Sequence, residues 1–388
     1  MRLIIYTNIL TPYRIYFFDI LNNICKKNNV FFKVLVMAET EIGRNWTYEK
    51  YKRNYTLLLS NKTLKFKNIE IHFNKNLLNC IKEFNPTHIV CAGSYLCPGV
   101  KTILSNKLKL NYKVYFWSES HLNETRNYSL IKLKVREIIR NYMYKKFDGF
   151  WYAGKQSLKF IKKYANENFD SIFIPNLVNN NIFDYHNTLE KDIEKMIKKY
   201  SLEDRKLTFI CPARLIPEKG IDKFLKGLAN NHNRKNITII IPGEGFLKEP
   251  IMNIADTYGI DVRILGFLNQ NELSILYSIA DVFLMPSISD ANPLTCIEAL
   301  WEGLPLLVSK NVGNYAEVIS EGKNGFVFDY SNVKELESII DKFLNWSEDD
   351  FKRAKEFSYS LACRNYRAED VALKIVSKYK GIMELYEN

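Results

Sequence analysis

The chain has 388 residues, 47% of them hydrophobic, which is enough apolar material for two cores of common size. No apolar run approaches the roughly 18 residues that span a bilayer, so a transmembrane segment is not expected. Seven cysteines form no Cys-x-x-Cys pair, and reduced, buried thiols are the simple interpretation. These totals predict a protein that stays inside the cell.

The net charge of +12 is unevenly distributed. Residues 1–172 contain 29 Lys and Arg against 12 Asp and Glu, a net of +17, whereas the remaining residues contain 26 and 31, a net of -5. This asymmetry indicates an anionic partner for the N-terminal half, such as a membrane surface, a phosphorylated lipid or a nucleic acid. The alternative is a lysine-rich surface that merely stays hydrated.

Strand-like runs alternate with helix-like runs from the start of the chain. The strands expected in the first half are 2–7, 31–36, 69–73, 87–92, 113–117 and 149–153, with helices such as 14–26, 76–84, 129–147 and 155–165. Apolar strands that alternate with helices belong to parallel sheets covered on both faces. The first half therefore predicts a doubly wound α/β domain.

The pattern is interrupted at 172–185, which contains Pro175 and several asparagines, and then resumes. The second set of strands is 206–212, 237–243, 262–266, 281–287, 304–309 and 325–329, with helices at about 221–230, 247–258, 270–279, 293–302, 314–320 and 333–345 and a helical tail. We predict two Rossmann-like domains, 1–175 and 176–369, facing across a cleft. A C-terminal helix at about 370–388 is expected to pack back on the first domain.

The stretch "SISDANPLTCIEALWEGLP" (287–305) predicts a helix that starts at Pro293, with Asn292 as its N-cap. The free amides of Leu294 and Thr295 then point into the cleft from a helix end that favours anions. A phosphate is the natural ligand of such amides.

Two carboxylates flank this phosphate position. Glu298 is free to accept hydrogen bonds from neutral hydroxyls such as those of a ribose, and Asp290 can meet hydroxyls at the ligand's other end. This arrangement suits a sugar nucleotide. The alternative is that Glu298 is a solvated helix residue and Asp290 a turn former.

Two cations and a glycine turn follow strands of the second domain. Arg214 and Lys219 flank the loop after strand 206–212, where they can neutralise a diphosphate and stabilise it as a leaving group. Gly243 ends the strand-like run 237–243, and its lack of a side chain lets a ligand approach the backbone. A tight turn explains this glycine equally well.

Candidate residues in the first domain lie where strand 113–117 and the first strand end. Glu119 and His121 are placed to face the cleft, where His121 can polarise a sugar hydroxyl or assist proton transfer. Tyr13 and Arg14 open the first helix and are candidates for contact with an acceptor phosphate. An idle loop histidine is the alternative for His121.

The expected helix 129–147 is basic and amphipathic, which suits anionic lipid headgroups, although a helix packed on its own sheet with solvated lysines fits as well. The sequence has no zinc spacing, Walker loop, Gly-x-Ser-x-Gly elbow or Asp-x-Asp pair. No metal and no cofactor are therefore expected.

Four motifs carry a resemblance: "ARLIPEKGID", "IIPGEGF", "LYSIADVFLMPSISDANPLTCIEALWEGLPLLVS" and "EVISEGKNGFVFD". Together, over about 206–330, they resemble the donor-binding domain of retaining GT-B glycosyltransferases of family 4. The N-terminal half resembles the family loosely, in element order and in "TPYRIYFFDIL".

The resemblance implies that Arg214 and Lys219 bind the donor diphosphate, that Glu298 binds the ribose, and that the amides near Leu294 and Thr295, after Pro293, touch the distal phosphate. Asp290 falls where the family usually has the first Glu of an acidic pair. This shorter acid is a departure. A second is the first loop, "NILTP", which is Gly-rich in many relatives. A third is that Glu119 and His121 both lie near the position of the family's active-site His, and either can be its equivalent.

The implied reaction is transfer of a hexose, with retention, from a nucleoside-diphosphate sugar, UDP-linked first and GDP-linked next. The implied acceptor is a glycan or a polyprenyl-diphosphate-linked glycan of cell-surface polysaccharide or lipopolysaccharide assembly. The charge of the first domain adds an expectation of peripheral contact with anionic membrane at the cytoplasmic face.

Three other functions are weighed. A sugar-nucleotide epimerase of the same architecture would convert the donor without an acceptor. A catalytically dead paralogue would only bind sugar nucleotide. This alternative stays open because Asp290 replaces the family's usual Glu. A nucleic-acid binder is not expected, because no recognised motif or exposed aromatic platform is found.

Overall fold

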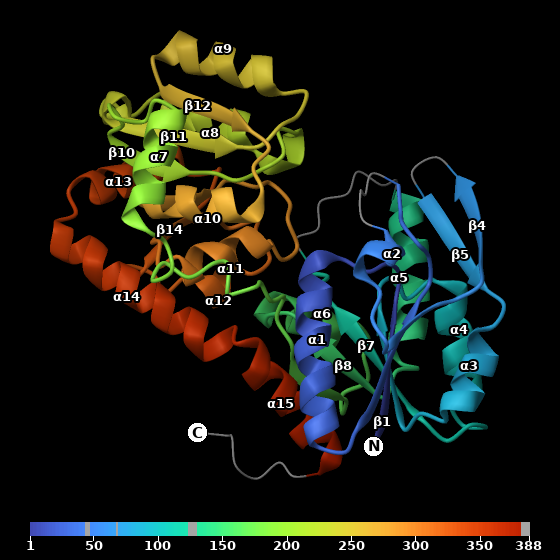
Figure 1. Ribbon diagram of the computed structural model, residues 1–388. Helices are drawn as coiled ribbons and strands as arrows, with labels where there is room; N and C mark the ends of the chain where they lie inside the picture. The colour runs from blue at the N-terminus through green and yellow to red at the C-terminus, as the bar shows by residue number, and fades with distance from the viewer. Residues whose placement is uncertain (43–46, 67–68, 123–129, 382–388) are drawn as a thin grey trace. The chain divides into compact units, whose positions relative to one another are not determined.

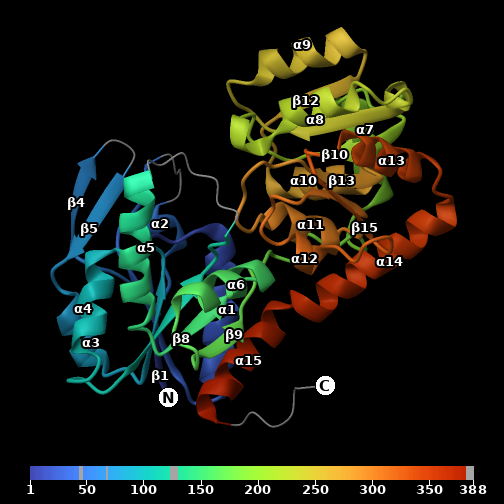
Figure 2. The same cartoon turned by 180° about the vertical axis from the view of Figure 1, so that it is seen from behind.

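The computed structural model describes residues 1–42, 47–66, 69–122 and 130–381 (Figures 1 and 2). The chain forms two compact units. The first unit consists of Met1–Ser120, Arg126–Leu177 and Ala368–Asn388, and the second of His121–Thr125 and Val178–Arg367.

The first unit is built on a parallel sheet that has, in its described part, seven strands in the order β3-β2-β1-β6-β7-β8-β9. The strands are β1 (Arg2–Thr7), β2 (Phe31–Val36), β3 (Thr56–Leu58), β6 (His88–Ala92), β7 (Lys113–Ser118), β8 (Gly149–Tyr152) and β9 (Asp170–Phe173). The helices are α1 (Pro12–Lys27), α2 (Tyr48–Tyr51), α3 (Leu77–Phe84), α4 (Pro98–Asn106), α5 (Leu130–Tyr144), α6 (Lys155–Tyr164) and α15 (Ala368–Lys380). The strand order reverses between β1 and β6, which is the switch point of a doubly wound sheet.

Both faces of this sheet are covered because successive strand residues point to opposite sides. Ile4 and Tyr6 of β1 pack into a buried cluster with residues of α3 and α4, and Leu3 and Ile5 are equally buried. α15 packs against α1, and the Trp151 indole donates a 2.6 Å hydrogen bond to the Tyr379 hydroxyl.

One strand expected in this sheet lies outside it. The run predicted at 69–73 is β5 (Ile69–Asn74), which pairs antiparallel with β4 (Asn61–Phe66) in a separate two-stranded ribbon. The sequence "IEIHF" alternates apolar with polar residues, which is the pattern of a half-buried ribbon and not of a parallel strand buried on both faces. In this ribbon His72 is buried while Ile71 and Phe73 are exposed.

The second unit is built on a parallel sheet that has, in its described part, six strands in the order β12-β11-β10-β13-β14-β15. The strands are β10 (Leu207–Ile210), β11 (Ile237–Pro242), β12 (Asp261–Gly266), β13 (Val282–Met285), β14 (Leu306–Ser309) and β15 (Gly325–Phe328). The helices are α7 (Glu190–Lys199), α8 (Ile221–Leu228), α9 (Lys248–Tyr258), α10 (Gln270–Ile279), α11 (Leu294–Trp301), α12 (Tyr315–Val318), α13 (Val333–Leu344) and α14 (Glu348–Asn365). This is the Rossmann strand order, with its switch point between β10 and β13.

The pair of doubly wound parallel-sheet units is confirmed, but several elements differ from expectation. β3, β4, β9, α2, α4 and α7 were not predicted, and the tail forms two helices, α14 and α15. The predicted residues 382–388 of the last helix and residue 129 of the helix 129–147 lie outside the described residues. Short strands such as the three-residue β3 carry too few residues for a clear periodicity.

The start of α11 also differs by one residue. Pro293 occupies the cap position with extended backbone, and the helix begins at Leu294. Pro293 and not Asn292 is therefore the N-cap residue, and the Asn292 amide oxygen accepts a 2.9 Å hydrogen bond from the Asn314 amide. Within the described residues, no helix is both long enough and apolar enough to cross a membrane.

Candidate active site

The loops that follow β10 and β13 meet at the switch point of the second unit, and both carry predicted site residues. Lys219 Nζ lies 2.5 Å from Asp290 Oδ2, in an ion pair between half-buried side chains. The Ile288 amide donates a 2.9 Å hydrogen bond to the Glu218 carbonyl and ties the two loops together. Two residues that are 71 positions apart in the chain are thus held as one charged pair.

Gly220 allows this close approach. Its φ of 65° lies in the left-handed region, and a Cβ built there would lie 2.3 Å from the Pro286 carbonyl oxygen. The Tyr330 hydroxyl donates to the carbonyls of both Pro286 and Gly220, at 2.5 and 3.1 Å. A larger residue at position 220 would therefore push the β10 loop away from the β13 loop.

Gly243 likewise allows a close contact between two backbone segments. A Cβ there would lie 1.9 Å from the carbonyl oxygen of Ala213, so the turn after β11 rests directly on the backbone of the β10 loop. This contact supports the segment that presents Arg214. The Arg214 side chain is exposed, and the structure gives it no carboxylate partner among the described residues.

Glu298 lies on the buried side of α11, only 8% exposed. Its Oε2 accepts a 2.9 Å hydrogen bond from the hydroxyl of Tyr277, a fully buried residue of α10. Burial raises the pKa of Glu298 to about 7, and the Tyr277 hydrogen bond opposes that rise. The interpretation of Glu298 as a solvated helix residue is therefore wrong. Sequence reasoning missed Tyr277, because nothing marks a tyrosine in an apolar helix as the partner of a carboxylate.

Three of the charged residues predicted for the site, Lys219, Asp290 and Glu298, lie near the buried thiol of Cys296. Burial raises the pKa of Cys296 well above its ordinary value, and Asp290, Lys219 and Glu298 all act on that pKa through their charges. The first amides of the same helix, those of Leu294 and Thr295, have no acceptor among the described residues. The structure thus brings a cation, two carboxylates and two free amides to one edge of the sheet.

A second buried carboxylate lies one turn further along, just past the end of α11. Glu302 is almost fully buried, and the Ser274 hydroxyl donates a 2.6 Å hydrogen bond to its Oε1. Its Oε2 has no hydrogen-bond partner among the described residues. Burial raises the pKa of Glu302 to about 8. Sequence reasoning did not single out this residue.

In the first unit, Arg14 is the centre of a second group of predicted residues. Its Nη1 donates a 2.7 Å hydrogen bond to Thr7 Oγ1, and its Nη2 lies 3.6 Å from Glu119 Oε1. The guanidinium also lies over the Trp117 ring, 5.2 Å from its centroid. A small pocket adjoins this group and is lined by Tyr13, Arg14, Phe17, Trp117, Pro175, Asn176 and Leu177.

Several buried polar atoms beside this pocket lack hydrogen-bond partners among the described residues: Arg14 Nε, Trp117 Nε1, Glu119 Oε1 and Thr11 Oγ1. Unsatisfied buried donors and acceptors are rare in folded proteins and mark places where water or a ligand belongs. The edge of the first sheet at β1 and β7 is therefore a second candidate binding region.

Glu119 and His121 are assigned to different units. Glu119 belongs to the first unit and pairs with Arg14, whereas His121 is buried and is grouped with the second unit. No set of three or more His, Cys, Asp or Glu side chains in the described part of the chain is arranged to hold a metal ion.

Residues 192–360 match the model of a family described as "Glycosyl transferases group 1". The matched segment contains Arg214, Lys219, Asp290 and Glu298. It covers the greater part of the second unit and none of the first sheet.

Curated relatives match over part of the chain. An uncharacterized glycosyltransferase of Methanocaldococcus jannaschii is 26% identical over 193 residues, 48% of this chain and 48% of that protein. The alpha-monoglucosyldiacylglycerol synthase of Acholeplasma laidlawii is 27% identical over 158 residues, 40% of this chain and 39% of that protein. The chain thus spans about half the length, or less, of the curated relatives it matches.

Solved structures match over nearly the whole chain. HepE of Anabaena, in complex with UDP, superposes with a TM-score of 0.74 at 14% identity, covering 98% of this chain and 100% of that one. A glycosyltransferase from Rickettsia africae superposes with a TM-score of 0.73 at 17% identity, covering 99% of each chain. At these identities the likeness shows the fold, which is GT-B with two Rossmann-like units.

Proposed function

We propose that this chain is a retaining glycosyltransferase of family 4 that transfers a hexose from a nucleoside-diphosphate sugar to a glycan or a lipid-linked glycan. The donor is UDP-linked in the first instance and GDP-linked in the second. The observation that carries the proposal is the Lys219–Asp290 ion pair, held beside Glu298 and the free amides of α11 within the segment that matches a glycosyltransferase family.

The donor diphosphate binds between Arg214 and Lys219 on one side and the amides of Leu294 and Thr295 on the other. Arg214 is exposed and without a carboxylate partner among the described residues, so a diphosphate is its natural counter-ion. The two cations stabilise the negative charge that grows on the departing nucleoside diphosphate, and no metal ion is needed for that task. Retention follows when a phosphate oxygen of the departing group takes the acceptor proton on the same face.

Glu298 binds the ribose and Asp290 the transferred sugar. The Tyr277 hydroxyl donates a hydrogen bond to Oε2 of Glu298, so the carboxylate has a fixed orientation before a nucleotide binds. Asp290 is fixed in the same way by Lys219, which compensates for a side chain shorter than the family's usual Glu. Preorganised groups of this kind lose little entropy when the donor binds.

We propose that the acceptor binds to the first unit, near Tyr13, Arg14 and Glu119.

We propose that this unit also touches an anionic membrane through α5, as an enzyme acting on a lipid-linked acceptor at the cytoplasmic face of the plasma membrane. Four residues of α5 at spacings of four, three and four form one apolar stripe and are strongly exposed: Ile131 (79%), Val135 (49%), Ile138 (69%) and Tyr142 (61%). Lysines flank the stripe at 132, 134, 145 and 146, and apolar residues with flanking lysines suit anionic headgroups.

A donor screen tests the proposal. The purified chain is mixed, without added metal, with a panel of UDP-, GDP-, ADP- and dTDP-sugars, and both the melting temperature and the release of nucleotide are measured. One donor is expected to stabilise the chain and to be hydrolysed slowly. Arg214→Ala should abolish both effects, while Lys223→Ala, which removes an exposed cation from α8 of the same unit, should preserve them.

Product analysis completes the test. With an acceptor present, the new glycosidic bond should have the anomeric configuration of the donor, as read from proton coupling constants. Conversion of the donor into its epimer without any acceptor would instead identify an epimerase. Failure of every donor to stabilise the chain would contradict the proposal.

A further inference from the structure

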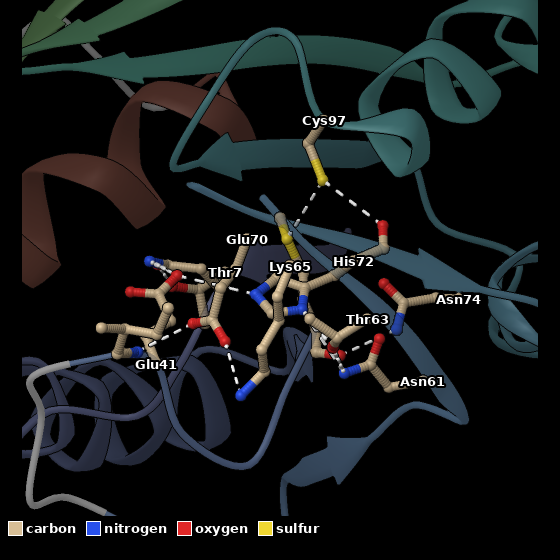
Figure 3. A network of polar contacts seen from close by, with 12 residues as sticks. Thr7, Glu41, Asn61, Thr63, Lys65, Glu70, His72, Asn74 and Cys97 are labelled. Carbon is tan, nitrogen blue, oxygen red and sulfur yellow. Dashed lines mark hydrogen bonds and ion pairs between the residues drawn. The ribbon is translucent and has the colours of Figure 1, made fainter. Parts of the chain in front are cut away.

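The buried histidine of the β4–β5 ribbon lies close to the loops that follow β1 and β2. His72 projects inward from β5 toward Glu41, which follows β2 (Figure 3). Asn8, which follows β1, is the third member of the group. Asn8 Nδ2 donates a 2.7 Å hydrogen bond to Glu41 Oε1, and His72 Nε2 lies 3.8 Å from the same oxygen. The three side chains come from three different segments and converge on one point.

The polar contacts on the far side of the ring favour one tautomer of His72. The Asn61 amide donates to Thr63 Oγ1 at 2.8 Å, so the Thr63 hydroxyl proton is available for His72 Nδ1, which lies 2.8 Å away. Asn61 Nδ2 lies 3.4 Å from the same ring nitrogen. Because both neighbours can donate to Nδ1, this arrangement favours the tautomer in which Nδ1 accepts and Nε2 carries the ring hydrogen. Figure 3 shows the ring between these two side chains and Glu41.

The donor at Nε2 is unsatisfied. His72 is only 4% exposed, and its Nε2 has no hydrogen-bond partner among the described residues. The 3.8 Å separation from Glu41 Oε1 is too long for a direct hydrogen bond. A buried donor left without an acceptor costs about 1–3 kcal/mol, so an acceptor oxygen at this position would be stabilising.

Glu41 is the member of this group that reaches the surface. Its side chain is 28% exposed, while the Asn8 amide holds one of its oxygens in place. A ligand hydroxyl can therefore accept from His72 Nε2 and donate to the Glu41 carboxylate at the same time. A hydroxyl is one of the few groups that can do both.

The charges nearby favour a neutral ligand. Glu41 and Glu70 are both acidic, and Lys65 is already paired with Glu70 at 3.2 Å. Glu70 also accepts a 2.8 Å hydrogen bond from the Ile42 amide, so this second carboxylate is fixed beside the first. An approaching phosphate would be repelled, whereas a sugar hydroxyl would not.

We propose that Glu41 and His72 form a binding site for the hydroxyl groups of a neutral sugar, which is a saccharide unit of the acceptor. The inference rests on the proposed function, since only a glycosyltransferase needs a sugar acceptor. The site is continuous with the Arg14–Glu119 pair: Arg14 binds Thr7, and the next residue, Asn8, binds Glu41. One acceptor glycan can therefore contact both pairs along the edge of the first sheet.

Binding of simple glycosides tests this site without any donor. Saturation-transfer NMR is recorded on the full chain with the methyl glycosides of glucose, galactose, mannose and N-acetylglucosamine. At least one is expected to bind, and Glu41→Gln should weaken that binding about tenfold or more, because a hydrogen bond to a charged group contributes roughly 1.5–3 kcal/mol. Inorganic phosphate should not compete.

The controls separate this inference from the proposed function. Glu39→Gln, the same change at an exposed carboxylate two residues away, should bind the glycoside as the unmodified chain does. His72→Phe is the second variant, with the same expected loss, and circular dichroism and melting temperature verify that each variant is folded. If the unmodified chain binds a sugar nucleotide but no glycoside, the inference fails while the proposed function stands. Glycoside binding that survives both variants, or competition by phosphate, would also overturn it, and the His72 donor would then be satisfied by water.

Discussion

The hydroxyl of Tyr277 donates a 2.9 Å hydrogen bond to Oε2 of Glu298, between two buried side chains on neighbouring helices. The bond leaves the other oxygen of Glu298 for a ligand and lowers the cost of keeping this carboxyl ionised. Tyr277 is therefore placed to position the ribose-binding group without touching the nucleotide itself.

Replacing Tyr277 by Phe tests this role. Without the hydrogen bond, Glu298 loses the interaction that opposes its raised pKa and becomes more protonated at neutral pH, and its orientation is no longer fixed. The affinity for the nucleoside diphosphate of the donor should fall about tenfold, as measured by calorimetry. Affinity for the 2′,3′-dideoxy nucleotide should hardly change, since it lacks the hydroxyls that Glu298 binds. Equal losses for both nucleotides would mean that Tyr277 only supports the fold, and Tyr258→Phe, at a partly exposed tyrosine of α9, is the matched control.

Asp290 decides between an active enzyme and a protein that merely binds sugar nucleotide. Asp290→Asn removes the partner of Lys219, and the rate of transfer should fall about 100-fold while the affinity for the nucleoside diphosphate changes little. Asp290→Glu keeps the charge and should retain most of the rate. Steady-state kinetics with separate values of kcat and KM measure both. An unmodified chain that binds donor but transfers no sugar to any acceptor would support the dead-paralogue alternative.

Glu302 makes the stability of the second unit depend on pH. Burial raises the pKa of this carboxyl from 4.5 to about 8, so the folded state holds a proton that the unfolded state releases. The associated stability is fully present below about pH 4.5 and is lost as the pH rises through about 8. Each pKa unit corresponds to about 1.4 kcal/mol, so the total loss is on the order of a few kcal/mol.

Calorimetry of Glu302→Gln measures this effect, because glutamine is neutral at every pH and can still accept from Ser274. The variant and the unmodified chain should melt at similar temperatures at pH 5, and the variant should melt several degrees higher at pH 9. Glu249→Gln, at an exposed carboxylate of α9, should follow the unmodified chain throughout. A pH-independent difference between the Glu302 variant and the unmodified chain would contradict the prediction.

The apolar stripe of α5 predicts binding to anionic vesicles. Ile131→Ser with Ile138→Ser removes its two most exposed residues, and burying such side chains in a membrane contributes roughly 1.5–3 kcal/mol each. Flotation with phosphatidylglycerol vesicles should show at least a tenfold loss of bound protein in the double variant. Leu108→Ser changes a residue that is 90% exposed elsewhere on the same unit, and it should have no effect. Binding of the unmodified chain that shows no preference for anionic lipid would remove this part of the proposal.

The parallel sheets and their helices are predictable from sequence because apolar periodicity marks both kinds of element. The ribbon of β4 and β5 is not predictable in the same way, since "IEIHF" is a plausible strand but its partner "NKTLKF" is polar and lysine-rich. Its function in holding His72 depends on contacts between segments that are far apart in the chain.

The candidate site divides similarly. Lys219 and Asp290 follow buried strands whose carboxyl ends must lie at one edge of a sheet, so their proximity can be anticipated. The residues that hold the site residues in place cannot be anticipated in this way. Tyr277, Asn8 and Glu41 occupy ordinary positions in the sequence, and only the packing of the helices and loops gives them their neighbours.

The last described helix completes the first unit. α15 covers α1 with Ile375 and Val376 buried, and Lys380 donates a 2.8 Å hydrogen bond to the Asn28 carbonyl. During synthesis the first sheet leaves the ribosome well before this helix is made, so the part of α1 that α15 covers stays exposed until α15 has been translated. The first unit is therefore completed only after the second sheet has been made, and a truncation before Ala368 would damage the core of the first unit while sparing the second sheet.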